Sequence, residues 1–227
     1  MPFSRFTCVC ALTVISFLSP TGSAFAQQPE PVPLIAVETP AKHLPVADLI
    51  KQMKLGGHVL LIRHERTELP SVADDYTKPS DDCRSQRNLS ASGFAGAQET
   101  RVALRALAIP IGRVLSSPMC RATETARQMF VTYDIDQRLM HEMEDQGRTN
   151  DVAGADLQRV LDGLKNEAAN IALVTHAGLI HRATGLRLPE GGIAVLKHEA
   201  SGWVLVRQLM GSDLGPHARE ALGPVKP

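Results

Sequence analysis

The sequence is poor in aromatic residues and carries no net charge. Only 4% of its 227 residues are aromatic, and 24 lysines and arginines balance 24 aspartates and glutamates. A platform that stacks nucleic-acid bases needs aromatic side chains, and attraction to a nucleic acid or to an anionic membrane needs an excess of positive charge. The composition therefore argues against both kinds of partner. The length is sufficient for one medium-sized domain with a substantial core.

Long hydrophobic runs are also missing. The most apolar uncharged stretch, residues 8–18, is short, whereas about 20 apolar residues are needed to cross a bilayer. It follows Arg5 and precedes Ala24-Phe25-Ala26, a pattern typical of signal-peptide cleavage sites. We therefore expect residues 1–26 to be a cleaved signal peptide. The mature protein would be periplasmic or secreted, without stable membrane insertion.

Cysteine is scarce, and the expected cleavage makes it scarcer. Of the four cysteines, Cys8 and Cys10 lie in the expected signal peptide, so Cys83 and Cys120 remain. An even pair in an oxidising compartment can form a disulfide, and the sequence leaves a disulfide and two free thiols equally open. Neither cysteine lies in a motif that would activate a catalytic thiolate.

The sequence pattern changes at residue 46, from proline-rich to helical. Residues 27–45 are rich in proline and have no hydrophobic period, which predicts an extended linker. Residues 46–55 have apolar side chains at helical spacing, and Gly56-Gly57 follows as a stop signal. We expect a folded domain over residues 46–210 and a carboxyl-terminal tail over residues 211–227.

Three short apolar runs predict buried strands that end in reactive side chains. The runs cover residues 59–62, 113–116 and 170–175. The side chains at or just beyond their ends are Arg63, His64, Arg121 and His176. In open α/β sheets, ligands bind at the carboxyl ends of the strands. We therefore expect these four side chains to meet at one edge of a sheet.

Helices and further strands are expected between and after these runs. The predicted helices cover residues 91–107, 121–130, 157–164 and 177–184, and two more strands cover residues 193–197 and 203–209. Ser90 is placed to cap the first of these helices. Arg121 falls in the first turn of the second helix, where free amide groups and the helix dipole favour an anion.

Three motifs occur in an order that resembles a known family. They are Leu61-Ile62-Arg63-His64 with the nearby Thr67, then Ser116-Ser117-Pro118 followed by Arg121-Ala122 and Thr125-Ala126, then Val174-Thr175-His176-Ala177-Gly178. Over roughly residues 56–209 the chain resembles the histidine phosphatase superfamily, also called the phosphoglycerate mutase-like or RHG family. The resemblance implies an α/β fold, a three-layer α/β/α sandwich with a mostly parallel central sheet. Glu65 replaces the family's usual glycine, and the short spacing between the two histidines resembles the compact branch without a large cap.

The resemblance also implies roles for the four strand-end residues. His64 would attack phosphorus as a neutral imidazole and become phosphohistidine. The guanidinium groups of Arg63 and Arg121 would hold the phosphoryl oxygens, and His176 would add a donor where negative charge develops.

Further contacts follow from the resemblance with less support from the residues themselves. Arg87, Asn88 and Ser117 are implied as substrate-binding residues, although Arg87 could equally satisfy backbone carbonyls in its loop. Glu142 is the expected proton donor because it lies in the acidic stretch that follows Leu139, with Glu144 close behind, and a solvated acidic loop is the alternative. No metal or cofactor is expected, because the histidines lack a metal-binding spacing and the arginines would repel a cation.

Three functions remain open at this point. The first is a phosphatase that acts through phosphohistidine on an extracytoplasmic phosphomonoester, either a small molecule or a cell-envelope phosphosugar, with protein phosphohistidine as another candidate. The second is a phosphoglycerate mutase-like phosphotransferase, which export and the compact spacing disfavour. The third is a non-catalytic phosphosugar-binding module, which Glu65 leaves open. The sequence does not indicate the oligomeric state.

Overall fold

The computed structural model describes residues 36–38, 43–68, 74–141, 148–165 and 167–223. The expected signal peptide and the expected proton donor Glu142 lie outside these ranges. No helix within them has the length and apolar character that crossing a bilayer requires.

The described residues contain a seven-stranded sheet in the order β1-β7-β6-β2-β5-β3-β4. The strands are β1 Val37–Glu38, β2 Val59–Arg63, β3 Ile111–Ser116, β4 Asp134–Ile135, β5 Asn170–Thr175, β6 Gly192–Glu199 and β7 Gly202–Met210. Strand β5 pairs in parallel with β2 and β3, and β6 is antiparallel to β2 and β7. The predicted mostly parallel α/β fold is confirmed.

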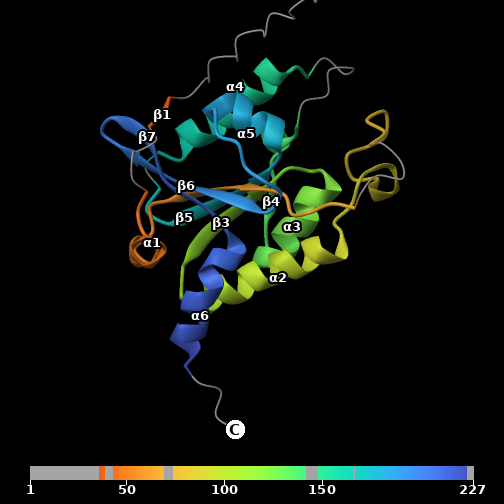
Figure 1. The fold of residues 1–227 in the computed structure, drawn as a ribbon. Helices are drawn as coiled ribbons and strands as arrows, with labels where there is room; N and C mark the ends of the chain where they lie inside the picture. The colour runs from red at the N-terminus through yellow and green to blue at the C-terminus, as the bar shows by residue number, and fades with distance from the viewer. Residues whose placement is uncertain (1–35, 39–42, 69–73, 142–147, 166, 224–227) are drawn as a thin grey trace, which may run out of the picture. The chain divides into compact units, whose positions relative to one another are not determined.

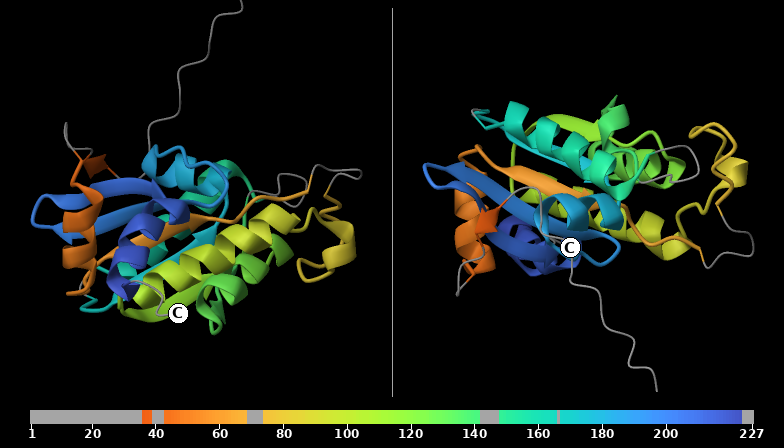
Figure 2. Two further views of the ribbon diagram at one scale, coloured as in Figure 1. Left: turned by 60° about the horizontal axis from the view of Figure 1, so that its bottom comes forward. Right: turned by 90° about the horizontal axis from the view of Figure 1, so that it is seen from above.

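Helices cover both faces of this sheet (Figures 1 and 2). One face carries α1 Val46–Met53, α2 Ala91–Ala106, α3 Cys120–Phe130 and α6 Gly215–Leu222, and the other carries α4 Asn150–Gly163 and α5 Ala177–Thr184. The central strand β2 supplies both cores by simple alternation. Leu60 and Ile62 pack with α1 to α3, whereas Val59 and Leu61 pack with α4 and α5.

A buried asparagine fixes the amino-terminal ends of the central strands. The side-chain amide of Asn170 donates to the carbonyls of Met53, at 2.6 Å, and Pro110, at 2.8 Å. Its oxygen accepts from the backbone amide of His58 at 3.2 Å. Because β2, β3 and β5 are aligned at this end, their carboxyl ends also come together at the opposite edge of the sheet.

Helix α4 is longer than the sequence predicts. It begins at Asn150, not at residue 157, and the hydroxyl of Thr149 accepts from the amide of Val152 as its cap. The first turns of α4 contain small and acidic residues that give little hydrophobic periodicity, so the prediction found only the apolar second half. The cap of α2 agrees with the prediction, since the Ser90 hydroxyl accepts from the Gly93 amide.

The ends of the domain also differ from the expectation. Residues 211–222, predicted to belong to a tail, form a 3₁₀ turn Gly211–Leu214 followed by α6. Leu214 and Ala218 are buried in the same hydrophobic core as the inner face of α2. Strand β1, which lies in the predicted linker, pairs with β7. Strand β1 and residues 211–222 each contribute only one or two side chains to the core. So few apolar positions give no hydrophobic periodicity in the sequence.

Candidate active site

The structure brings the predicted strand-end residues together. His64 directly follows β2, and its backbone amide donates to the carbonyl of Thr175, the last residue of β5. His176 comes next in the chain, and the ring centroids of the two histidines lie 5.3 Å apart. Both side chains are buried, with exposures of 3% for His64 and 4% for His176. The pairing of β2 with β5 therefore places two imidazoles side by side.

The ring of His64 is held in one tautomer. Its Nδ1 lies 2.8 Å from the backbone carbonyl oxygen of Glu65. A carbonyl oxygen can only accept, so Nδ1 carries the proton and Nε2 keeps its lone pair. Burial, followed by the charge of Arg121, lowers the pKa of His64 to about 3. The imidazole is therefore neutral at physiological pH, as a nucleophile must be.

Ser117 positions the second histidine. Its hydroxyl lies 2.8 Å from Nε2 of His176 and accepts from the backbone amide of Met119 at 3.3 Å. When the hydroxyl proton is donated to Nε2, His176 carries its own proton on Nδ1. Burial, then the charge of Arg121, lowers the pKa of His176 well below its usual value. Ser117 thus contacts His176, where the sequence had implied a contact with substrate.

Three arginines surround the histidines. Arg121 lies in the first turn of α3 and is only 3% exposed, whereas Arg63 and Arg87 are partly exposed. All three charges lower the pKa of His64. Arg63 donates to the carbonyl of Leu188 at 3.0 Å. The guanidinium groups therefore form a positive field around an imidazole that is itself uncharged.

Several buried donor atoms at this site have no hydrogen-bond partner within the described part of the chain. They are Nε of Arg63, Nε of Arg121 and Nδ1 of His176, whereas Nη1 of Arg121, which makes no hydrogen bond either, lies 3.4 Å from the carboxylate of Asp74. An unpaired buried donor is costly unless a ligand supplies the acceptor. A tetrahedral oxyanion presents several acceptor oxygens to such a set of donors. The residues present therefore fit a phosphoryl group.

Sequence analysis missed three polar residues that line the site. Asp74 and Tyr76 lie in the stretch between Thr67 and Cys83, for which the sequence predicted no helix or strand, and His141 follows a short 3₁₀ turn Gln137–Leu139. The ring of His141 lies 5.1 Å from His176 and 4.7 Å from Tyr76, measured between centroids. These residues come from segments without hydrophobic periodicity, so their only signal was their residue type.

The two loop residues implied as substrate contacts have different positions. Arg87 reaches the site, where its charge acts on His64 and Arg121. Asn88 is exposed, and its side-chain amide donates to the carbonyls of Cys83 and Gln86. The structure therefore does not bring the side chain of Asn88 into the site. The side chain of Asn88 instead stabilises the loop that carries Arg87.

A disulfide ties this loop to the helix that carries Arg121. Cys83 and Cys120 are bonded, with their Cα atoms 5.5 Å apart. The side-chain oxygen of Gln86 accepts from the backbone amide of Cys120 at 3.1 Å, which adds a second link. The loop and the first turn of α3 are thereby fixed to each other beside the two histidines.

Glu65 is accommodated because two glycines face it. Its side chain is 3% exposed, and burial raises the pKa of the carboxyl group, although a hydrogen bond from the Arg66 amide partly offsets this effect. A Cβ atom at Gly96 would lie 2.7 Å from Oε1 of Glu65, and one at Gly191 would lie 2.7 Å from its Cδ. The volume of the glutamate is thus matched by missing side chains on α2 and on the turn before β6.

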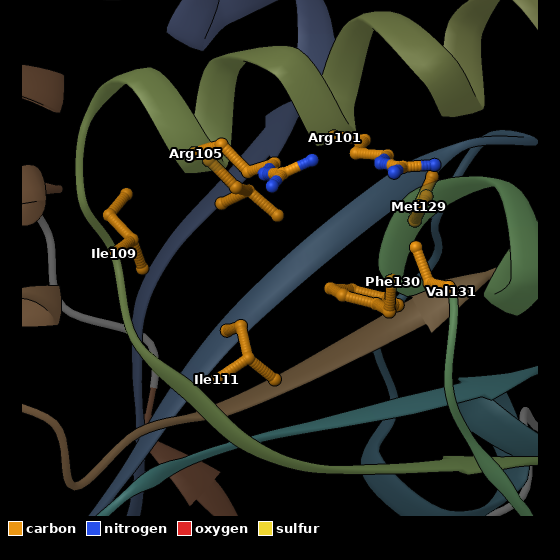
Figure 3. A pocket seen from close by; sticks show the side chains of 8 residues that line it. Arg101, Arg105, Ile109, Ile111, Met129, Phe130 and Val131 are labelled. Carbon is orange, nitrogen blue, oxygen red and sulfur yellow. The ribbon is translucent and has the colours of Figure 1, made fainter.

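One small cleft lies beside Tyr76, and another lies at the far edge of the sheet. The first has a volume of about 160 Å³ and is lined by residues that include Tyr76, Gln86, Met119 and Met140. The second, shown in Figure 3, is lined by Arg101, Arg105, Ile109, Ile111, Met129, Phe130 and Val131. Ile111 begins β3, so the second cleft is at the sheet edge opposite the histidines. It contains no nucleophile, which leaves the chemistry to the edge that carries His64.

Of the comparisons with known proteins, the one with solved structures found proteins of similar fold. No protein-family model matches the sequence, and no curated protein matches it. Among solved structures, the protein histidine phosphatase SixA complexed with tungstate is 19% identical, with a TM-score of 0.50 over 69% of this chain and 99% of that one. The alpha-ribazole phosphatase from Shigella flexneri is 18% identical, with a TM-score of 0.50 over 65% of this chain and 94% of that one.

A third solved structure is similar to the same extent. The phosphoserine phosphatase from Entamoeba histolytica, in complex with 3-phosphoglyceric acid, is 17% identical, with a TM-score of 0.50 over 66% of this chain and 95% of that one. The TM-scores show a shared fold, and identities this low leave the substrate open. The chain has the phosphoglycerate mutase-like fold of the histidine phosphatases.

Proposed function

We propose that the protein is a histidine phosphatase that hydrolyses a phosphomonoester through phosphohistidine on His64. The observation that carries this proposal is the state of His64. Its imidazole is buried and neutral, Nδ1 is held by the Glu65 carbonyl, and three arginines lie around it. A neutral nucleophile within a positive field is the combination that a dianionic phosphoryl group requires.

The reaction has two steps in which bonds and protons balance. In the first, Nε2 of His64 forms a bond to phosphorus, the bond to the leaving oxygen breaks, and a carboxylic acid gives that oxygen its proton. In the second, the acid, now a carboxylate, takes a proton from water as the water oxygen attacks phosphorus. The nitrogen–phosphorus bond then breaks and inorganic phosphate is released. Arg63 and Arg121 hold the phosphoryl oxygens throughout, and Nδ1–H of His176 donates to one of them.

The assignment of the acid stays a prediction. Glu142 remains our choice, and it lies outside the described residues together with Glu144. The described carboxylates nearest the arginines are already engaged. Glu190 lies 3.6 Å from Arg63 and accepts from Thr67, while Asp74 lies 3.4 Å from Arg121. The pKa of Asp74 is below its usual range, because hydrogen bonds and arginine charges outweigh its burial, which makes it a poor proton donor.

We also propose that the protein works outside the cytoplasm. The charged amino terminus, the short apolar stretch and the Ala24-Phe25-Ala26 pattern support a cleaved signal peptide. A disulfide that links two active-site segments supports an oxidising compartment. Fractionation of the native host followed by amino-terminal sequencing tests this proposal, with Gln27 expected as the first residue of the exported form.

The substrate is proposed only as a class. It is a phosphomonoester of a small molecule, such as a phosphosugar or an amino-acid phosphate, or a protein phosphohistidine. A panel of phosphosugars, phosphoserine and phosphohistidine, compared by kcat/KM, would rank these candidates. A clear preference for phosphohistidine in an intact protein over every small ester would exclude the small molecules, and hydrolysis of none of these compounds would contradict the proposed class.

The decisive experiment concerns His64. Wild-type protein should release phosphate from para-nitrophenyl phosphate and should hold acid-labile phosphate when quenched during turnover. His64→Ala should show neither, and His217→Ala, which changes a histidine of α6, should behave as wild type. Normal turnover by His64→Ala would disprove the mechanism. Phosphate binding without turnover by wild type would indicate the non-catalytic module, and transfer to an added acceptor would indicate a mutase.

A further inference from the structure

One acidic side chain lies among the arginines that the proposed function assigns to the phosphoryl group. The carboxylate of Asp74 is only 4% exposed and lies 3.4 Å from Nη1 of Arg121. It also accepts from the backbone amide of Arg87 at 2.6 Å and lies 3.4 Å from Nε of the same residue. The hydroxyl of Tyr76 donates to it at 3.0 Å. One buried carboxylate thus contacts two of the three arginines.

This arrangement resembles that of a bound oxyanion. A carboxylate and a phosphate ester use the same donors, since each presents charged oxygens to guanidinium and amide hydrogens. Asp74 receives two guanidinium groups, one amide and one hydroxyl. It has the donor set that a phosphate oxygen would take, but it is part of the chain.

A second anion cannot approach Arg121 and Arg87 without interacting with Asp74. Two like charges a few ångströms apart repel strongly where water is excluded, and Arg121 is only 3% exposed. Any phosphoryl group that uses Arg121 must therefore displace the carboxylate or accept its repulsion. On its carboxyl side the backbone is held, because the amide of Asp75 donates to the carbonyl of Ser85 at 2.8 Å.

We propose that Asp74 is a specificity-determining residue that acts as an internal competitor for the phosphoryl group at Arg121 and Arg87. This inference rests on the proposed phosphatase function and concerns the same site. Inorganic phosphate and weakly bound esters would have to displace the Asp74 carboxylate with the binding energy of the phosphoryl group alone. A substrate whose leaving group makes further contacts would overcome it more easily, so the competition favours the correct ester over the free phosphate product.

The test measures the binding of inorganic phosphate to the mature, disulfide-bonded protein by isothermal titration calorimetry. Asp74→Asn keeps the size of the side chain and an acceptor oxygen for the Arg87 amide while removing the charge, and Asp74→Ser is a second neutral variant in case the first misfolds. Both should bind phosphate on the order of 10-fold more tightly than wild type, as expected when one screened like charge is removed. Asp75→Asn is the matched control, because Asp75 is the exposed neighbour that accepts from Thr77. It should bind as wild type does.

The outcomes separate this inference from the function on which it rests. Equal or weaker binding by both neutral variants would overturn the inference and leave the phosphatase intact, since Asp74 would then only hold the arginines in place. A loss of kcat that is larger for alkyl phosphates than for para-nitrophenyl phosphate would also overturn it, because Asp74 would then be the proton donor. Absence of phosphate binding by every protein, wild type included, would overturn the proposed function itself.

Discussion

Lowering the pH should destabilise the folded protein through His64. The folded-state pKa of His64 is about 3, against an ordinary value of 6.5. Above pH 6.5 the imidazole is neutral in both states and contributes nothing to the pH dependence. Between these two values the unfolded chain binds a proton that the folded protein does not, so the free energy of unfolding decreases as the pH falls. Below pH 3 the penalty is complete and stays constant.

The size of the effect follows from the same two pKa values. Their difference corresponds to a total of about 5 kcal/mol, and about 3 kcal/mol of it should develop between about pH 7.5 and about pH 4.5. The physical cause is burial of the ring, strengthened by the charges of Arg121, Arg63 and Arg87. A total stability of about 5 to 15 kcal/mol is usual for a domain, so the effect is large enough to measure.

The assay is urea unfolding followed by the fluorescence of Trp203, the only tryptophan, which is buried. Wild type and His64→Asn are compared at the two pH values, because asparagine is neutral at both. Wild type should lose about 3 kcal/mol more than the variant, while contributions from carboxylates cancel in the comparison. His176 remains in both proteins and leaves a residual pH dependence. His217→Asn should follow wild type, and a parallel decrease in wild type and His64→Asn would refute a neutral buried His64.

Three further predictions concern the disulfide, the acid and the glutamate. In the mature protein, which lacks Cys8 and Cys10, reduction of Cys83–Cys120, across a separation of 37 residues, should lower the free energy of unfolding by roughly 3 to 4 kcal/mol. The double serine variant should be insensitive to reductant, and two alkylatable thiols in the non-reduced mature protein would contradict the bond. Glu142→Gln should slow hydrolysis of alkyl phosphates by about 10²- to 10⁴-fold and that of para-nitrophenyl phosphate much less, whereas equal slowing would exclude a proton donor. Gly96→Ala should destabilise wild type, because the new Cβ would lie 2.6 Å from Nη2 of Arg66 and 2.7 Å from Oε1 of Glu65. In a protein that also carries Glu65→Ala and Arg66→Ala, the same change should stabilise by about 0.5 to 1 kcal/mol, the usual helix preference for alanine. The same sign in both backgrounds, measured by thermal unfolding, would refute the crowding.

The parts of the site that the sequence predicts are those carried by regular structure. Arg63, His64 and His176 follow buried strands, and the alternation or continuity of apolar residues identifies such strands. Parallel pairing then brings their ends to one edge without further information. Arg121 was predictable for the same reason, because a helix begins just after the second of the three apolar runs ends.

The parts that the sequence did not predict are carried by loops. Asp74 and Tyr76 reach the site because the loop folds back onto α3, through the disulfide and through contacts such as Gln86 to Cys120. Such contacts depend on tertiary structure and leave no periodic pattern in the sequence. Asn88 shows the opposite error, since the family resemblance implied a substrate contact but its side chain binds the backbone of its own loop.

The low pKa values of the two histidines also bear on how the site would respond to its substrate. In the free protein, both imidazoles are neutral because they are buried beside cationic arginines. A bound phosphate dianion would offset those charges, and an opposite charge close to an imidazole raises its pKa. In the proposed mechanism His64 bonds to phosphorus, so the ring available to take up a proton is His176. Its Nε2 is already bonded to Ser117 and its Nδ1 has no partner among the described residues. The site would therefore gain a cationic donor when the anion arrives, while the free protein avoids adding one more positive charge to a buried cluster of arginines.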